Sequence, residues 1–354
     1  MDVKINSGEL NRVARILSGY IDSRMMAFSS VEMCHEDGLL SFRAYSGVEH
    51  IRLSVPAMGG DGEKVKVDGK TLQKIAAVQR GEVHITSDGA SVTFRGTGRT
   101  KTPALGTDMV VPDMIDGQRV NVRGEDLLRV IGKTEHAIST DESRMTITGE
   151  LLEAENGQML MMAMNIAQLS IEECPCGPGG TFKAVIPGAA LRKIKNCISP
   201  SDMVTITADQ KRVNIFAPGT EIVCGLILGE FPDRTRLIPT VFKTEVLIRT
   251  EAVKQAFRAA MEISGAPMVK IIFENHQMTV TGNSEAASFD ETVDCDIRGD
   301  ELMIAFDGRV AMSALNSIDD ENITLRMNSP TSPAVIHTED GNGTRLFLPV
   351  RAFI

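Results

Sequence analysis

The sequence predicts an α+β fold, because one succession of strand, helix and paired strands occurs three times along the chain. In each copy a short strand runs into a helix, and two strands separated by a turn follow, at residues 65–94, 182–216 and 303–337. A further strand and helix open each repeat, at residues 3–17, 120–131 and 246–260. Runs of strands with few helices between them are typical of antiparallel sheets with helices packed against them.

The length of the repeat predicts the domain organisation. Repeats of this size are whole domains rather than the units of a solenoid. A chain of 354 residues is also long for a single hydrophobic core. We therefore expect three domains, each with two helices on antiparallel sheets, over residues 1–118, 119–240 and 241–354.

Apolar residues at helical spacing predict six helices. In the stretch after Pro187, for example, Leu191, Ile194 and Ile198 fall on one helical face. The first helix of each repeat carries a glutamate in its first turn, where an acidic side chain suits the positive end of the helix dipole. The expected helices span residues 7–18, 69–80, 123–138, 187–198, 250–264 and 307–319.

The second repeat shows the strand pattern between its two helices. Alternating apolar residues predict strands at residues 145–148, 151–154, 159–163 and 168–171. The dipeptides Thr148-Gly149 and Asn156-Gly157 are expected to form the hairpin turns between neighbouring strands.

Composition points to the cytoplasm and to no bound cofactor. No apolar run approaches the about 18 residues of a membrane span, so no membrane partner is expected. The N-terminal segment lacks a basic region followed by an apolar block, so secretion is not expected. The six cysteines are then reduced thiols. Cys174 and Cys176 are expected in a loop, because prolines and glycines surround them. No other Cys or His stands at metal-ligand spacing, so a metal site is not expected.

The distribution of charge suggests a role with nucleic acid despite the net charge of −10. The expected helices 69–80 and 187–198 contain lysine and arginine but no acidic residue. Lysine and arginine bind the phosphate backbone whatever the base sequence, and a local basic face can coexist with an acidic whole. Basic helices without a base-reading motif suit a protein that holds DNA without reading it. The alternative is that these side chains only solvate exposed helix faces.

The sequence gives no sign of an active site. It contains no phosphate-binding loop, no dinucleotide fingerprint, and neither an H-E-x-x-H nor a G-x-S-x-G motif. The six histidines are dispersed. We therefore expect a protein that is not an enzyme.

Several segments, taken in order along the chain, resemble the beta subunit of bacterial DNA polymerase III, the beta sliding clamp. The most specific is GEFPDRTRLIP at residues 229–239. The others are RMTITGELLE at residues 144–153, Leu315-Asn316 in the last helix and LPVR at residues 348–351. The resemblance extends over essentially the whole chain.

This resemblance implies a DNA sliding clamp: a head-to-tail homodimeric ring, lined by helices, that encircles duplex DNA and tethers DNA polymerase. Two chains would supply twelve helices. Helices packed about 10 Å apart give a ring on the order of 120 Å around. Subtracting about 5 Å of helix radius on each side leaves a hole roughly 28 Å wide, enough for a duplex. The alternative function is a binding or assembly module that keeps the clamp fold but no longer encircles DNA.

The resemblance also implies two sets of site residues. Sequence-independent contacts with double-stranded DNA would come from Arg24, after the first helix, and from helical cations, namely Lys70, Lys74, Arg192, Lys193, Lys195, Lys254 and Arg258. DNA polymerase and the clamp loader would dock short peptides in an apolar pocket. That pocket would use Ile147, Met164, Ile166, Gln168, Leu169, Pro232, Arg236, Leu237, Met268, Thr331, Pro333, Leu346, Leu348, Pro349, Val350 and Arg351.

One wall of the implied pocket departs from the family pattern. The family usually carries Thr-Asp-Gly-His-Arg-Leu there, whereas this chain reads Met-Asn-Ile-Ala-Gln-Leu at residues 164–169. An aromatic residue often found in the last helix is replaced by Val310. These differences predict a divergent clamp with a more apolar pocket, to which standard clamp-binding peptides bind less well.

Overall fold

The computed structural model describes all of residues 1–354 except 61, 107–108, 110–111, 113–114, 286 and 352–354. Backbone contacts divide the chain into two compact units. Unit 1 comprises residues 1–128, 155–157 and 176–226, and unit 2 comprises residues 129–154, 158–175 and 227–354. Among the described residues, no helix is both long and apolar enough to cross a membrane.

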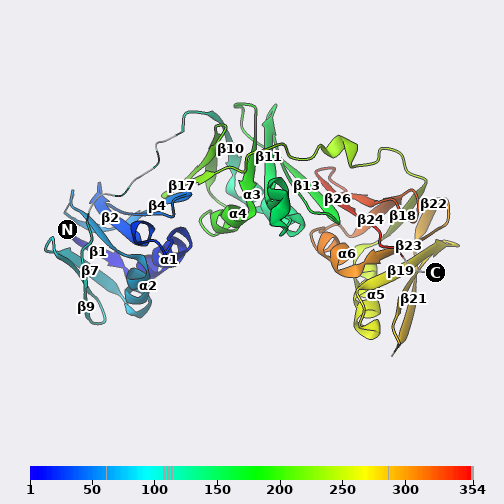
Figure 1. The fold of residues 1–354 in the computed structure, drawn as a ribbon, viewed down its shortest axis with the longest axis horizontal. Helices are drawn as coiled ribbons and strands as arrows, with labels where there is room; N and C mark the ends of the chain where they lie inside the picture. Colours follow the sequence, from blue (N-terminus) through cyan, green and yellow to red (C-terminus); the bar gives the residue numbers. More distant parts are fainter. Residues whose placement is uncertain (61, 107–108, 110–111, 113–114, 286, 352–354) are drawn as a thin grey trace. The chain divides into compact units, whose positions relative to one another are not determined.

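Unit 1 contains two antiparallel sheets (Figure 1). The first has the order β5 (Met58–Gly60), β1 (Asp2–Asn6), β7 (Glu82–Ser87), β8 (Ser91–Arg95) and β9 (Arg99–Pro103). The second has the order β10 (Gln118–Arg123), β15 (Met203–Ala208), β16 (Arg212–Ala217), β17 (Thr220–Gly225), β4 (Glu49–Pro56), β3 (Leu39–Tyr45), β2 (Ser30–Glu36) and β6 (Lys64–Asp68). In it, β17 pairs with β4, so strands of the first two expected domains share one sheet.

The helices of unit 1 are α1 (Ser7–Leu17), α2 (Gly69–Val78) and α4 (Gly188–Lys195), which follows β14 (Phe182–Pro187). Two short 3₁₀ helices, η1 (Ser18–Tyr20) and η2 (Met26–Phe28), follow α1. Helices α1 and α2 pack side by side. Side-chain caps fix where these two helices begin, since Asn6 accepts a hydrogen bond from the Gly8 amide at 2.7 Å and Asp68 accepts one from the Thr71 amide at 2.8 Å.

Unit 2 also contains antiparallel sheets (Figure 1). One runs in the order β11 (Gly149–Glu155), β12 (Gln158–Met164), β13 (Gln168–Pro175), β26 (Gly343–Phe347), β25 (Ala334–His337), β24 (Asn322–Met327), β18 (Thr244–Arg249) and β22 (Asp296–Gly299). The other runs β21 (Ser288–Asp294), β20 (Gln277–Asn283), β19 (Met268–Glu274) and β23 (Leu302–Asp307). Because β13 pairs with β26, strands of the second and third expected domains share a sheet.

Helices α5 (Thr250–Ser264) and α6 (Gly308–Leu315) pack together in unit 2. Helix α3 (Gly124–Thr134) begins in unit 1 and ends in unit 2. Three 3₁₀ helices, η3 (Glu135–Ala137), η4 (Glu142–Thr148) and η5 (Arg234–Arg236), complete unit 2. The apolar core of the C-terminal part gathers side chains from α5, α6 and both sheets, Phe257, Phe273, Phe306 and Phe347 among them.

All six expected helices are present, although most end earlier than predicted. Leu191, Ile194 and Ile198 are buried, as the apolar stripe predicted. Glu9, Glu125 and Glu251 lie in the first turns of α1, α3 and α5. The three-domain division stays a prediction, because sheets join strands across its expected boundaries and the contacts form two units instead.

Three expectations about the second repeat are wrong. Residues 145–148 are not a strand but part of the 3₁₀ helix η4, where Asp141 accepts a hydrogen bond from the Ser143 amide at 3.0 Å. The Thr148-Gly149 pair is therefore not a hairpin turn, and Gly149 begins β11. The Asn156-Gly157 turn is present, with positive φ at both residues. Cys174 is not in a loop but buried near the end of β13.

Candidate nucleic-acid interface and partner pocket

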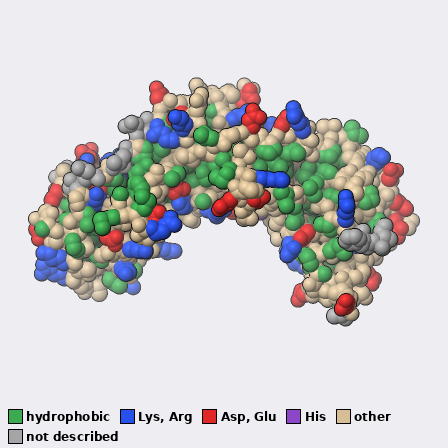
Figure 2. Space-filling view, in the orientation of Figure 1, with side chains coloured by type: hydrophobic (Ala, Val, Ile, Leu, Met, Phe, Trp, Pro, Cys, Tyr) green, Lys and Arg blue, Asp and Glu red, His purple; other side chains and the backbone are tan. Residues whose placement is uncertain are grey.

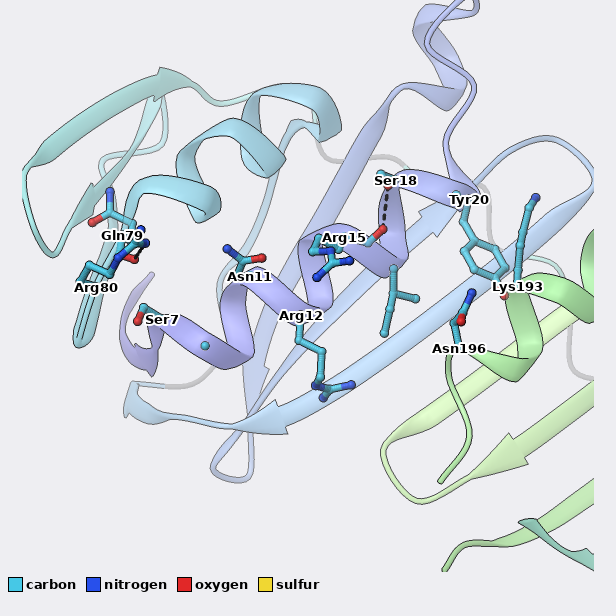
Figure 3. A pocket seen from close by; sticks show the side chains of 13 residues that line it. Ser7, Asn11, Arg12, Arg15, Ser18, Tyr20, Gln79, Arg80, Lys193 and Asn196 are labelled. Carbon is cyan, nitrogen blue, oxygen red and sulfur yellow. Dashed lines mark hydrogen bonds between the residues drawn. The ribbon is translucent and has the colours of Figure 1, made fainter. Parts of the chain in front are cut away.

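A cavity of about 720 Å³ in unit 1 brings together cations from three helices. Arg12 and Arg15 reach it from α1, Arg80 from just beyond α2, and Lys193 from α4 (Figure 3). In Figure 2, Lys and Arg side chains gather on the part of unit 1 where α1 and α2 lie. The cavity is therefore a positively charged hollow between helices.

The arginines of this cavity differ in the hydrogen bonds that their side chains make within the protein. Arg12 donates to Glu9 at 2.8 Å, one turn earlier in α1. Arg80 donates to the carbonyl oxygens of Ala77 at 3.0 Å and Gln79 at 2.7 Å, so it keeps its full positive charge. Among the described residues, no hydrogen bond or ion pair engages the side chain of Arg15. These three arginines were not predicted as site residues, although their spacing along the first helix and after the second could have suggested it.

The other predicted cations of unit 1 lie at the surface. Lys70 and Lys74 are exposed on α2, and Arg192 is exposed on α4. Arg24 is 88% exposed and donates to both carboxylate oxygens of Asp22, at 3.0 and 2.9 Å. Its hydrogen bonds lower the pKa of Asp22 to about 2. The Arg24 charge is thus offset by a neighbouring carboxylate.

Lys193 does not extend freely into solvent, as a DNA contact would require. It forms an ion pair with Glu49, and its ammonium lies 5.3 Å from the centre of the Tyr20 ring. Glu49 stands on β4, far from α4 in sequence, so the pairing could not be seen in the helix alone. Lys195, two residues further along, is partly buried.

Lys254 also departs from its predicted role, because only 8% of it is exposed. Its ammonium donates to the carbonyl oxygen of Ile318 at 3.4 Å and pairs with Glu251 at 3.1 Å. Arg258, one turn later on α5, is exposed and approaches the Asn316 amide oxygen at 3.5 Å. Of the two predicted cations on α5, only Arg258 is accessible.

A second cavity, of about 470 Å³, lies in unit 2 and is lined mainly by apolar side chains. Its predicted members are Ile147, Met164, Ile166, Gln168, Leu169, Pro232, Leu237, Leu346 and Leu348. Figure 2 shows hydrophobic side chains gathered near β13 and β26 on this unit. The structure therefore brings together residues that are widely separated in sequence.

The remaining predicted pocket residues, all within the part of the chain that the structure describes, lie outside the lining of this cavity. They are Arg236, Met268, Thr331, Pro333, Pro349, Val350 and Arg351. The C-terminal segment turns away because Pro349 bridges to Phe306 and the Val350 amide donates to the carbonyl oxygen of Ala305 at 2.8 Å. Arg236 pairs with Asp233 at 3.7 Å on the outside of η5.

In the wall formed by residues 164–169, a tight turn between β12 and β13 carries Ile166 at its tip, and Met164 and Leu169 on either side also line the cavity. Asn165 accepts hydrogen bonds from the amides of Ala167 at 2.8 Å and Gln168 at 3.1 Å. Ile166 is left 68% exposed at the edge of the cavity.

Gln168, on the same wall, has a structural role. Its amide nitrogen donates to the carbonyl oxygen of His136 at 3.0 Å, and its amide oxygen accepts from Ser313 at 2.9 Å. Both ends of the Gln168 amide are thus occupied within the protein. The wall therefore presents mainly apolar side chains to the cavity.

Three further lining residues were not in the predicted set, namely Arg144, Thr146 and Asn165. Arg144 and Thr146 belong to η4, which was expected to be a strand, so their approach to the cavity could not be anticipated. Asn165 lies inside the wall segment that already differed from the family pattern. Arg144 is exposed and is the charged side chain of the described lining.

Comparisons of the sequence with known proteins all find the same kind of protein. The family model described as the central domain of the DNA polymerase III beta subunit matches residues 121–233, and the one described as its C-terminal domain matches residues 235–351. Beta sliding clamps of Staphylococcus epidermidis and Staphylococcus aureus are 24% identical over 297 residues, which cover 81% of this chain and 77% of each relative.

Solved structures show the same fold. The DNA polymerase sliding clamp of Bacillus subtilis superposes with a TM-score of 0.93 at 22% identity, over 100% of both chains. The DNA polymerase III beta subunit of Thermotoga maritima superposes with a TM-score of 0.90 at 20% identity, over 99% of this chain and 100% of that one. Since the two family models together cover more than half of the sequence, the chain belongs to the DNA polymerase III beta subunit family, the beta sliding clamps.

Proposed function

We propose that this protein is a DNA sliding clamp, a non-catalytic processivity factor that encircles duplex DNA in the cytoplasm and tethers DNA polymerase to it. The observation that carries the proposal is that α2 and α4 bear lysines and arginines and no acidic residue, in a chain of net charge −10. Such helices attract phosphates without reading bases. Three repeated domains, over residues 1–118, 119–240 and 241–354, would each contribute two helices to the lining.

The ring would be a head-to-tail homodimer, and the free sheet edges support this arrangement. Strand β9 ends one sheet of unit 1 and carries the exposed cations Arg99 and Lys101. Strand β21 ends a sheet of unit 2 and carries exposed Asp290, Glu291 and Asp294. An unpaired strand edge offers free amides and carbonyls to another chain, and opposite charges favour the pairing of two such edges. A second copy of this chain supplies the complementary edge.

The cavity in unit 2 would dock short peptides from the polymerase and the clamp loader. Its apolar lining suits the insertion of hydrophobic side chains, which gain free energy by leaving water. The altered wall at residues 164–169 suggests a different preference from that of ordinary clamps. We expect a standard clamp-binding peptide to bind this protein more weakly than it binds the Bacillus subtilis clamp; equal affinities would refute the altered preference.

Two measurements separate a clamp from an assembly module of the same fold. A clamp sediments or elutes as a dimer of twice the 38.4 kDa chain mass, with or without DNA. It is also retained on a nicked circular plasmid and released when the plasmid is cut. A stable monomer, or equal retention on linear and circular DNA, would contradict the proposed function.

A further inference from the structure

Several helical cations of unit 1 are free to meet an external anion, although Arg12 and Lys193 pair with Glu9 and Glu49. In the described structure, no hydrogen bond or ion pair engages the side chains of Lys70 and Lys74 on α2 or of Arg192 on α4. The same holds for the side chain of Arg15 in the cavity beside them. Arg80 contacts only carbonyl oxygens. No acidic residue occurs within α2 or α4. The result is a surface on which several full positive charges are exposed together.

The helical cations of unit 2 are mostly neutralised by the protein itself. Arg129, in the part of α3 that belongs to unit 2, pairs with the buried Glu172. Lys133 pairs with Asp319 at 2.6 Å, and Arg309 of α6 pairs with Asp307 at 2.7 Å. Lys254 of α5 is buried and paired with Glu251. Only Arg258, among the described cations of these helices, is exposed without a carboxylate partner.

Acidic side chains near α5 make the surface of unit 2 still less positive than that of unit 1. A hollow of about 280 Å³ there is lined by Glu251, Asp319, Asp320 and Glu321, together with Arg249 and Lys254. Carboxylates repel the phosphate backbone at short range, and Arg249 and Lys254 do not outnumber them. The surface of unit 2 beside α5 is therefore expected to bind DNA weakly.

A paired cation gains little from a phosphate, because the carboxylate beside it already balances its charge. Binding would require the ion pair to separate or would bring the phosphate close to the carboxylate. An unpaired lysine or arginine instead neutralises a phosphate directly and releases the counterions condensed on the DNA, which is the main source of sequence-independent affinity. The two units should thus contribute unequally to DNA binding.

We infer that duplex DNA is held mainly by α1, α2 and α4 of unit 1, with Arg15, Lys70, Lys74, Arg80 and Arg192 as the phosphate-binding cations. Helices α3, α5 and α6 face the duplex with little net attraction. A homodimer then presents two separate basic patches, one on each copy. This inference rests on the proposed function and specifies which part of the chain performs it.

The test compares two double variants that remove the same number of helical charges. Lys70→Gln with Lys74→Gln alters unit 1, and Lys133→Gln with Arg309→Gln alters unit 2. The affinity of the full-length dimer for a short fluorescent duplex is measured by anisotropy over a series of salt concentrations. Dimer mass and circular dichroism confirm that both variants keep their fold.

The unit 1 variant should make the negative slope of log K against log salt shallower by about 2 for each copy that contacts the duplex, since each lost phosphate contact removes about 0.9 from its magnitude. The unit 2 variant should leave the slope unchanged. Equal reductions, no reduction by the unit 1 variant, or a larger one by the unit 2 variant would overturn the inference while the clamp function stands. Failure of the unaltered dimer to bind duplex at any salt concentration would contradict the proposed function as well.

Discussion

Arg345 places a guanidinium with no solvent exposure inside unit 2. It donates to Glu172 at 2.7 Å, to the hydroxyl of Ser317 at 2.6 Å and to the carbonyl oxygen of Ile171 at 2.6 Å. Glu172 also pairs with Arg129, so one buried carboxylate joins α3, β13 and β26. A buried charge that loses its partner pays the full cost of desolvation.

Glu172→Gln should therefore destabilise the protein by about 3–5 kcal/mol, because it leaves Arg345 buried without a counter-ion. Urea unfolding followed by circular dichroism measures the change. The matched control is Lys4→Gln, which removes an exposed ion pair with Glu82 and should barely move the unfolding midpoint. Similar midpoints for the two variants would show that the buried network contributes no stability.

His136 gives unit 2 a predictable pH dependence. Burial, together with the positive charge of Arg345, lowers the pKa of His136 from 6.5 to about 4. The unfolded chain then binds a proton that the folded chain does not between about pH 6.5 and pH 4, so stability falls as the pH falls through this window and is constant above it. His136→Leu should weaken this dependence in thermal unfolding scans, and the remainder belongs to His50 and His337, since burial lowers the pKa of each of them too. An unchanged profile would exclude His136 as its origin.

The turn at residues 164–169 forms one wall of the apolar cavity in unit 2. Ile166 is 68% exposed on the cavity edge, while Asn165 holds the turn and Gln168 is bonded to the protein on both sides. The segment can therefore change its outward side chain without loss of its fold.

Ile166→Asp should weaken the binding of a clamp-binding peptide by about tenfold, which corresponds to about 1.4 kcal/mol. The reason is that a carboxylate at this edge loses apolar contact and must be desolvated. Isothermal titration calorimetry measures the affinity, and Met203→Asp, an exposed methionine of β15 in unit 1, serves as the control. Equal weakening by both variants would point to a general charge effect rather than to this pocket.

The helices and most of the pocket lining could be predicted from the sequence, because helical periodicity is local and the family segments fix which loops converge. Whether an individual lysine or arginine is exposed or paired within the protein could not be predicted. Lys193 is paired with Glu49, 144 positions away, and Lys254 donates to the carbonyl oxygen of Ile318, 64 positions away. Residues 145–148 were misassigned because their alternation resembles a strand, whereas Asp141 caps a 3₁₀ turn there.

At the scale of the whole molecule, charge is unevenly distributed among the helices and strands. A net charge of −10 coexists with the acid-free helices α2 and α4 and with a basic edge strand, β9. In the proposed homodimer, the acidic edge strand β21 would pair with β9 of a second copy. Charge can in this way specify both where DNA binds and how two copies assemble.

Reversing the charge of one edge strand should break the homodimer. Mixing a variant with a reversed β9 and a variant with a reversed β21 should restore a dimer. Arg99→Glu with Lys101→Glu makes β9 acidic, and Asp290→Lys with Glu291→Lys makes β21 basic, so each variant alone juxtaposes like charges. A mixture of the two variants has complementary charges at both interfaces of a ring. Light scattering should report monomers for each variant and dimers for the mixture. Dimers of either variant alone would place the interface elsewhere.

The most direct test of the central claim is retention on circular DNA. Dissociated protomers are allowed to reassemble in the presence of nicked circular plasmid, and the mixture is gel-filtered in 1 M salt, where the Debye length is only about 3 Å and phosphate contacts are screened. A clamp that encircles DNA stays with the plasmid and is released when a restriction enzyme linearises it. Loss of the protein from intact circles at high salt, or its retention after linearisation, would contradict the account.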